Sequence, residues 1–300
     1  MAGYINGVEI EDTFAEGFRM WGGRVIITAV DRRWAHEAAS RMTGFATSII
    51  ACGCEAGIET QDATDTPDGR PGVSVLIFAQ TKDLLARQLV DRIGQCVLTC
   101  PTTACFNGLM PAEPVAVGGR LRFFGDTFQR SKVVGGRRYW RIPVMEGEFL
   151  VEEKFGVQRA IGGGNILILG EDQPVTLHSA ELAAEAMRGV AGVILPFPGG
   201  LVRSGSKVGS RYKFLGASTN DAFCPSLRGL VSSALPEGVN SVLEIVFDSL
   251  DVNAIEQAAR AGVLAACIPG IRRITAGNYG GKLGQFKIHL HKVLQEADWR

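Results

Sequence analysis

The sequence has no surplus of charge of either sign. Its 31 lysine and arginine residues balance 31 aspartate and glutamate residues among 300, so the formal net charge is zero. A zero balance removes the broad cationic field of a nucleic-acid-binding domain. The aromatic residues Phe78 and Phe247 stand among aliphatic residues and not beside basic ones, which disfavours a sheet that stacks RNA bases. We therefore expect no nucleic-acid partner.

Long apolar runs are missing too. The longest, such as residues 25–30, have the length of a β-strand, whereas a membrane helix needs about 20 apolar residues. Residues 1–6 lack the positively charged segment and apolar core of a secretory signal. We therefore expect a cytoplasmic protein with no membrane partner.

The sequence also lacks the spacing of a metal or disulfide site. Its seven cysteines form no C-x-x-C pair, and their odd number without a secretory signal favours buried, reduced thiols. His289 and His291 would lie on the same face of a strand, but nothing nearby supplies a third ligand. We expect no metal site.

Common signatures of nucleotide-binding proteins and hydrolases are absent. Residues 205–210 and 277–283 are rich in glycine, but neither has the order G-x-x-x-x-G-K-[ST]. No G-x-G-x-x-G opens a first strand–helix turn, and no G-x-S-x-G elbow occurs. The chemistry must therefore come from other residues.

Apolar periodicity predicts four amphipathic helices and eight strands. Asp251 is the expected N-cap of the last helix. The helices cover residues 33–42, 84–97, 177–187 and 252–266. The strands cover residues 24–30, 45–51, 73–79, 120–124, 165–169, 193–196, 241–248 and 272–276.

In chain order, each half gives strand, helix, strand, strand, helix and strand, although the closing strand of the first half is hard to place. This is the split βαβ pattern occurring twice. We predict an α+β fold of two ferredoxin-like lobes, residues 1–149 and 150–300, with mostly antiparallel sheets. Residues 98–149 add strands to the first lobe. Residues 197–240 form a long insertion in the second, and an insertion of that length is typically functional or disordered.

The strands are apolar on both faces. In residues 73–79, Val73, Val75 and Ile77 alternate with Leu76 and Phe78, and residues 242–247 alternate in the same way. Helices cover only one face of a ferredoxin-like sheet, so the other lobe, another subunit or both must bury the second face. We predict a homo-oligomer on this ground.

Glu244 interrupts an otherwise apolar strand. One interpretation is a salt bridge to a distant Arg or Lys, or a solvated position, because ionised carboxylates are rarely buried alone. The other is that burial raises the pKa of Glu244 until the side chain is protonated. A neutral acid can donate a hydrogen bond to a developing oxyanion, which is acyl-transfer chemistry without a covalent nucleophile.

The region from residue 204 to residue 225 combines glycines with hydroxyl, amide and cationic side chains. These polar side chains are Ser206, Lys207, Ser210, Arg211, Lys213, Ser218, Thr219, Asn220 and Asp221. This composition suits a polyanionic or heteroatom-rich ligand, although a solvated loop has a similar one.

Several runs of unusual composition resemble the formylmethanofuran–tetrahydromethanopterin formyltransferase family along essentially the whole chain. They are INGVEIEDTFAE (5–16), TPDGRPGV (66–73), DRIGQC (91–96), PFPGG (196–200), SKVGS (206–210), ASTNDA (217–222) and AGNYGGKLGQ (276–285).

This resemblance implies two ferredoxin-like lobes, a homotetramer and no prosthetic group. It implies reversible formyl transfer between the amine of methanofuran and N5 of tetrahydromethanopterin, in a ternary complex. The family's catalytic glutamate falls on Glu244, and its substrate-binding motifs fall on Ser206, Lys207, Asn220, Asp221 and Gln95.

The neutral charge departs from strongly acidic relatives of salt-rich cytoplasm, so salt-driven assembly is not expected. It suits an ordinary cytoplasm such as that of a methylotrophic bacterium. There the reaction runs toward formylmethanofuran, and formylmethanofuran-hydrolysing subunits are a potential partner. The alternative function is a non-catalytic assembly subunit of a formyltransferase/hydrolase complex, but Glu244 in its apolar strand argues against that.

Overall fold

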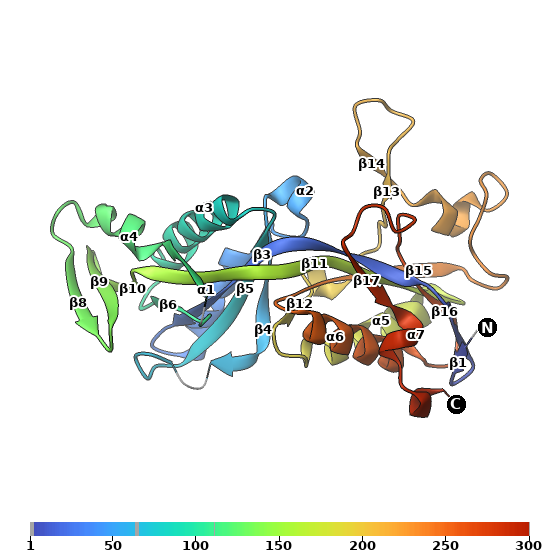
Figure 1. Cartoon of the computed structure of the whole chain (residues 1–300), viewed down its shortest axis with the longest axis horizontal. Helices are drawn as coiled ribbons and strands as arrows, with labels where there is room; N and C mark the ends of the chain where they lie inside the picture. Colours follow the sequence, from blue (N-terminus) through green and yellow to red (C-terminus); the bar gives the residue numbers. More distant parts are fainter. Residues whose placement is uncertain (1–2, 64–65, 111, 300) are drawn as a thin grey trace.

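The structure, a computed structural model, describes residues 3–63, 66–110 and 112–299. Two long antiparallel strands, β3 (Phe14–Thr28) and β11 (Lys154–Gly170), pair with each other along residues 18–23 and 157–162. Figure 1 shows that both strands run through the middle of the molecule, with long helices packed in each half. The two halves of the chain therefore share one continuous sheet.

The first half has the predicted order of strands and helices. Its sheet order is β6-β3-β5-β4, so the first strand lies between the third and the fourth, as in a split βαβ lobe. The strand that was hard to place is β6. After β3 come α1 (Arg32–Thr43), β4 (Glu55–Ala63), β5 (Gly72–Ala79), α3 (Lys82–Arg92) and β6 (Ala104–Asn107).

The second half repeats this topology, with the sheet order β16-β11-β15-β12. The neighbouring strands are antiparallel in both halves, so the predicted α+β class with two ferredoxin-like lobes is confirmed. After β11 come α5 (Gln173–Arg188), β12 (Val193–Ile194), β15 (Ser241–Ser249), α6 (Val252–Ala266) and β16 (Ile271–Ala276).

Shorter elements extend this frame at both ends, and the added strands expected within residues 98–149 are present. The boundary between lobes near residue 150 stays a prediction. The further strands are β1 (Gly3–Ile5), β2 (Val8–Ile10), β7 (Glu113–Ala116), β8 (Arg130–Val134), β9 (Arg137–Val144), β10 (Gly147–Glu152), β13 (Lys207–Val208), β14 (Ala217–Ser218) and β17 (Phe286–His289). The short helices are α2 (Ile49–Cys52), α4 (Gly118–Leu121) and α7 (Leu290–Val293).

Side-chain caps begin the four long helices. Asp31, Thr81, Asp172 and Asp251 each accept a hydrogen bond from the backbone N–H three residues further on. Replacing such a cap by alanine costs about 1 kcal/mol. The predicted N-cap at Asp251 is confirmed.

Two predicted strands are wrong. Residues 45–51 contain a turn, in which Phe45 has a φ of +49°, followed by α2, and the strand β4 begins only at Glu55. Residues 120–124 lie in α4 and a following 3₁₀ turn. There Arg122 donates to the Gly119 carbonyl and stacks on Trp140, so local contacts override the β propensity of this run.

Two further expectations need correction. The predicted helix 84–97 is α-helical only to Arg92 and continues as the π-helical turn Ile93–Val97. His289 and His291 do not share a strand face, because β17 ends at His289 and His291 lies in α7. The His291 ring is hydrogen-bonded to the Ile10 carbonyl, and this contact accounts for the position of the ring.

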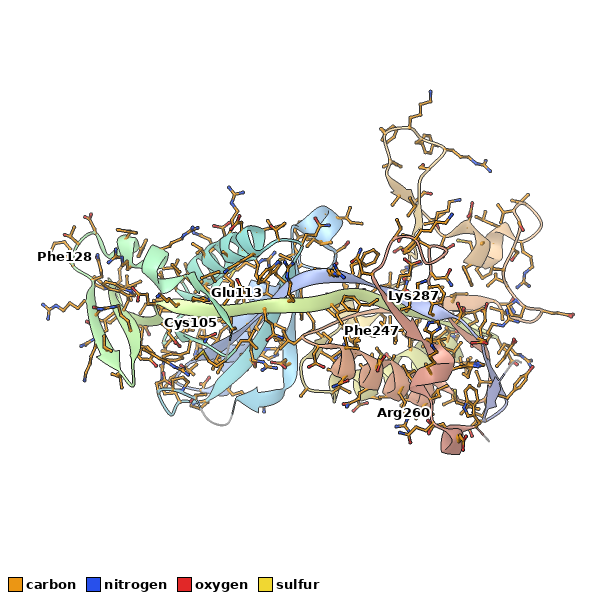
Figure 2. The ribbon with its side chains drawn as sticks, in the orientation of Figure 1. Cys105, Glu113, Phe128, Phe247, Arg260 and Lys287 are labelled. Atoms are coloured by element: carbon orange, nitrogen blue, oxygen red, sulfur yellow. The ribbon has the colours of Figure 1, made fainter. Side chains whose placement is uncertain are left out.

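The second face of the sheet is covered within the chain in the first lobe and partly covered in the second. Leu76 and Phe78 of the first lobe pack with Ile194 and Leu250 of the second. In the second lobe, Val242 packs against a small cluster that includes residues of the 197–240 insertion. Phe247, labelled in Figure 2, belongs instead to the large core under α5 and α6. The apolar face of the first lobe therefore does not by itself require a second subunit.

A pair of buried carboxyls joins the lobes. Glu55 of β4 is 6% exposed and Asp248 of β15 is fully buried. The Ile49 N–H donates to Glu55 Oε1 and the Gly163 N–H to Asp248 Oδ1. Burial and the neighbouring Glu55 raise the pKa of Asp248 well above its ordinary value, and burial raises that of Glu55. The neutral form of Asp248 is therefore favoured, and in that form it can donate a hydrogen bond to Glu55.

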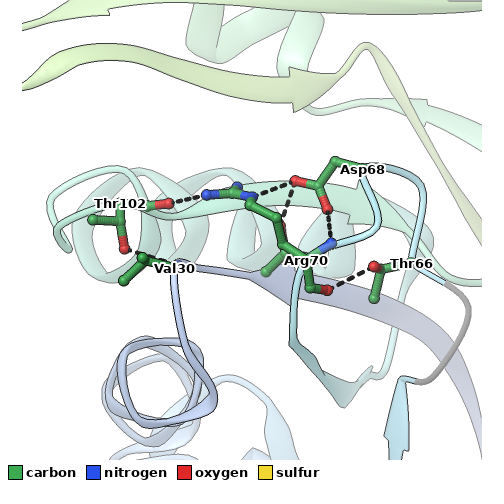
Figure 3. Close-up of polar contacts among 6 residues, drawn as sticks. Val30, Thr66, Asp68, Arg70 and Thr102 are labelled. Carbon is green, nitrogen blue, oxygen red and sulfur yellow. Dashed lines mark hydrogen bonds and ion pairs between the residues drawn. The ribbon is translucent and has the colours of Figure 1, made fainter.

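The run at residues 66–73 has a structural role in this lobe. The Arg70 guanidinium donates to the Asp68 carboxylate, to the Thr102 carbonyl and to the Thr28 hydroxyl, at 2.8, 2.6 and 3.1 Å (Figure 3). The Thr66 hydroxyl donates to the Arg70 carbonyl at 2.7 Å. Arg70 thus ties this turn to the end of β3 and to the loop before β6.

Candidate functional site

Glu244 lies on the face of the second lobe that α5 and α6 do not cover. It pairs in register with Leu167 of β11, and its backbone exchanges both hydrogen bonds with Val202. Val242 and Glu244 share one face of β15, while Leu243 and Ile245 face the helices. Glu244 therefore points into the region that the 197–240 insertion borders.

Asn165 of β11 is the nearest polar partner of Glu244. Its Nδ2 donates to Glu244 Oε1 at 2.6 Å, and the residue is only 8% exposed. The two residues are diagonal neighbours on adjacent antiparallel strands. Gly277 makes room for this amide, since a Cβ there would lie 2.3 Å from Asn165 Nδ2.

The electrostatic setting of Glu244 favours its neutral form. Burial raises the pKa of Glu244, and the hydrogen bond from Asn165 opposes the shift only in part. Among the described residues, no lysine or arginine forms an ion pair with this carboxyl. The second oxygen is therefore available to a ligand.

Tyr279 also borders Glu244. Its phenol lies near the side chain of Ser206 and within electrostatic range of the Glu244 carboxyl, since both groups act on its pKa. Burial, together with the charges of Glu244 and Glu16, raises the pKa of Tyr279. The structure thus brings the predicted residue Ser206 next to the predicted residue Glu244, through a tyrosine.

The other predicted residues of the 204–225 region gather at the base of a protruding hairpin. Lys207 Nζ donates to Asp221 Oδ2 at 2.5 Å, and this bond holds the pKa of Asp221 below its ordinary value. Asn220 packs close to Gly205. Figure 1 shows β13 and β14 leading into a loop that stands away from the body of the molecule.

Gln95 is placed apart from this group. It is exposed and lies in the π-helical turn after α3, where its carbonyl accepts a bond from the Thr99 hydroxyl. A role for Gln95 in substrate binding stays a prediction.

A cavity of about 730 Å³ adjoins the strand that carries Glu244. Its walls include Val202, Ser204 and Val242, and Phe197 and Pro225 add apolar surface from the insertion. This volume is within the range of small-molecule sites.

Three residues at this site escaped the sequence reasoning. Asn165 could have been noticed as the polar start of an apolar strand. Glu16 and Tyr279 lie in two of the runs that carry the resemblance, but the sequence does not show that they meet, because they are about 260 residues apart in the chain. In the described residues, no group of three or more His, Cys, Asp or Glu side chains could hold a metal. Within the same part of the chain, no helix is long and apolar enough to cross a membrane.

Comparison with known proteins covers nearly the full length. The sequence model of the formylmethanofuran–tetrahydromethanopterin formyltransferase matches residues 4–144, and that of its proximal lobe matches residues 147–293. A formylmethanofuran–tetrahydromethanopterin formyltransferase of Methylococcus capsulatus is 59% identical over 295 residues, which is 97% of this chain and 99% of the relative.

Two solved structures share the fold. The formyltransferase from Methanosarcina barkeri has a TM-score of 0.92 at 49% identity and covers 97% of this chain and 100% of its own. A chain of the formyltransferase/hydrolase complex from Methylorubrum extorquens, solved with methylofuran, has a TM-score of 0.95 at 49% identity, with 98% and 99% covered.

These similarities define the class of the protein as an enzyme that transfers a formyl group. More narrowly, the chain belongs to the formylmethanofuran–tetrahydromethanopterin formyltransferase family. The resemblance drawn from the sequence runs is thereby confirmed, and methanofuran and tetrahydromethanopterin are the two substrates. The relatives' names favour the enzyme over the non-catalytic subunit.

Proposed function

We propose that Glu244 acts as a neutral acid during reversible formyl transfer between methanofuran and N5 of tetrahydromethanopterin. The observation that supports this role is a mostly buried carboxyl whose pKa is raised, with an amide donor on one oxygen and no cation on either. Asn165 occupies Oε1, so Oε2 can carry the proton toward the substrate.

The reaction then runs through a tetrahedral intermediate. The lone pair of the attacking nitrogen forms a bond to the formyl carbon, and the carbonyl π electrons move to oxygen. The Oε2–H of Glu244 donates a hydrogen bond to that oxyanion, where a preorganised donor is most effective. When the oxyanion collapses, the bond to the first carrier's nitrogen breaks. The proton lost by the attacking nitrogen ends on the amine that leaves.

Binding both carriers at once supplies much of the remaining rate, because it converts a bimolecular step into an effectively unimolecular one. The cavity beside Val202 and Val242 and the polar base of the hairpin support a site for them. In this proposal Ser206, Lys207, Asn220 and Asp221 contact the carriers, and Gln95 contributes a further contact.

The proposal extends to assembly and location. The Methylorubrum extorquens relative is part of a formyltransferase/hydrolase complex. By analogy, this chain forms a homotetramer in the cytoplasm and docks with formylmethanofuran-hydrolysing subunits. In such a complex the reaction runs toward formylmethanofuran.

An absorbance assay with the purified chain, both carriers and no added metal tests the catalytic part. The parent chain turns over, and Glu244→Gln lowers kcat by about 10²–10³-fold, the usual effect of removing one oxyanion donor. Glu148→Gln, which alters an exposed carboxylate paired with Arg141, serves as a control with parental activity. Equal rates for Glu244→Gln and the parent would refute the acid role. No turnover by the parent would favour the assembly-subunit alternative.

A further inference from the structure

Glu16 is a buried carboxylate without a cationic partner among the described residues. It lies on β3, is 1% exposed, and accepts four backbone N–H bonds. The N–H groups of Tyr279 and Gly281 donate to Oε1 at 2.6 and 2.7 Å. Those of Leu283 and Gly284 donate to Oε2 at 2.9 and 2.5 Å. Burial alone would raise the pKa of Glu16, but the four bonds outweigh it and lower the pKa, so the side chain stays ionised.

The loop of residues 277–285 is shaped to converge on this carboxylate. Gly280 and Gly281 have φ values of +71° and +70°, a conformation that favours glycine and turns successive N–H groups to one side. A Cβ on Gly284 would lie 2.6 Å from Glu16 Cβ. Thr13 and Arg19 of the same N-terminal segment add a hydrogen bond each to the loop. This loop is therefore held almost entirely by residues from the start of the chain.

Tyr279 connects the Glu16 cluster to the site of Glu244. Its backbone N–H donates to Glu16, and its phenol lies near Ser206 and within electrostatic range of Glu244. The first residue of the loop, Gly277, leaves the space that Asn165 occupies while it bonds Glu244. One loop thus packs against Asn165, the hydrogen-bond partner of Glu244, and places Tyr279 near Glu244.

We propose that Glu16 is a positioning residue for formyl transfer, which fixes the loop 277–285 so that Tyr279 and Ser206 close one side of the site around Glu244. This inference rests on the proposed role of Glu244 in catalysis. Glu16 itself touches neither the substrates nor the reacting atoms. Its effect on the reaction passes through the position of Tyr279.

Glu16→Gln tests the proposal. Glutamine has one acceptor oxygen. Its NH₂ group faces the two N–H groups that donate to Oε2 in the parent, so two of the four hydrogen bonds are lost. We expect kcat/KM to fall by about 10²-fold, as for a small displacement near reacting groups. Because Glu16 acts through Tyr279, the double variant Glu16→Gln/Tyr279→Phe should lose no more activity than the worse single variant. Additive losses, or parental activity of Glu16→Gln, would overturn the proposal.

A spectroscopic titration reads the position of Tyr279 without activity. The signal of Tyr279 is the difference in tyrosinate absorbance between the parent and Tyr279→Phe as pH rises. Loss of the Glu16 charge alone lowers the pKa of Tyr279, so the position is read in Gly280→Ala, which keeps that charge. In Gly280→Ala the phenol leaves its buried position and ionises at lower pH than in the parent. An unchanged Tyr279 titration would refute positioning by Glu16 even if the proposed role of Glu244 failed in its own test.

Two further variants separate positioning from general loss of stability. Glu152→Gln alters another buried carboxylate that accepts a backbone N–H, that of Asn107 in the first lobe, and should leave kcat/KM and the Tyr279 titration unchanged. If Glu16→Gln fails to fold, Gly280→Ala strains the same loop at an open position where a Cβ meets nothing within 4 Å. It should shift the Tyr279 titration and lower kcat/KM, and an unchanged result would contradict the proposal.

Discussion

At the scale of single residues, the site depends on two groups. The pKa of the Glu244 carboxyl is raised by burial, and Asn165 donates one hydrogen bond to that carboxyl. The Asn165 amide donates to Glu244 Oε1, and it fits in this position because Gly277 has no side chain. An amide can donate there whether the acid is neutral or ionised, so Asn165 orients the carboxyl without neutralising it with a cation. This arrangement favours the neutral form of the Glu244 carboxyl, as the proposed acid role requires.

Asn165→Leu is expected to change both rate and pH dependence. Loss of one hydrogen bond of about 1 kcal/mol lowers kcat about five-fold. The bond from Asn165 lowers the pKa of Glu244, so its removal raises that pKa further. The acid form is then retained to higher pH, and the alkaline loss of activity moves upward. A pH profile of kcat/KM measures both effects, and a profile with an unmoved alkaline limb would contradict this assignment.

Sequence reasoning located Glu244 because a charged residue in a strand apolar on both faces is anomalous by itself. Ser206, Lys207, Asn220 and Asp221 were predicted from composition and resemblance, and the structure places them along one region of the insertion. Glu16 could not be predicted, since a lone glutamate in residues 14–28 looks like an ordinary solvated strand residue. Its meaning appears only when the loop 277–285 folds over it.

At the scale of elements, long periodic segments were predictable and short ones were not. The helix of residues 252–266 was predicted with its observed bounds, because a cap and a continuous apolar stripe both specify it. The runs 45–51 and 120–124 are too short for apolar character to separate strand from helix. There a left-handed Phe45 and the stacking of Arg122 on Trp140 decide the conformation.

The junction of β4 with β15 predicts how stability depends on pH. Asp248 has a raised pKa in the folded chain, so the native state binds more protons than the unfolded state above the ordinary aspartate range near 3.8. Stability therefore falls as pH rises from that value toward the raised pKa of the native state. In Asp248→Asn the amide donates to Glu55 at every pH and still accepts from Gly163, so this decline is smaller.

Urea unfolding midpoints at a series of pH values measure this difference. Asp251→Asn is the matched control, because it removes an exposed carboxylate nearby and keeps an effective N-cap. The control should follow the parental decline. Parallel curves for Asp248→Asn and the parent would show that the neutral form of Asp248 is not favoured.

At the scale of the whole molecule, the order of the helices and strands was predictable from the sequence. The pairing of distant strands that joins the two lobes into one sheet was not. Each half has the pattern of a split βαβ lobe, and the pattern was visible in the sequence. The pairing of β3 with β11, and of β2 with β16, joins residues more than 130 positions apart. No local pattern encodes such partners. Those pairings make one sheet of two lobes and bring both chain ends to the lobe of Glu244, as Figure 1 shows.

The neutral charge leads to a prediction about assembly. With 31 positive and 31 negative side chains, no large net repulsion needs screening by salt. Light scattering should therefore give the mass of four chains of 32.1 kDa at both low and high ionic strength. A single-chain mass, or a tetramer that appears only in high salt, would contradict the proposed homotetramer.

The pH dependence of kcat/KM in the parent and in Glu244→Gln tests the central claim most directly. A protonated Glu244 predicts a plateau at low pH in the parent and a decline as pH rises through the raised pKa of this carboxyl. Glu244→Gln should be slow at every pH and should lack that decline. Any pH dependence that comes from titration of the substrates should persist in both profiles. A parental activity that rises with pH over this range, or the same decline in Glu244→Gln, would contradict the account.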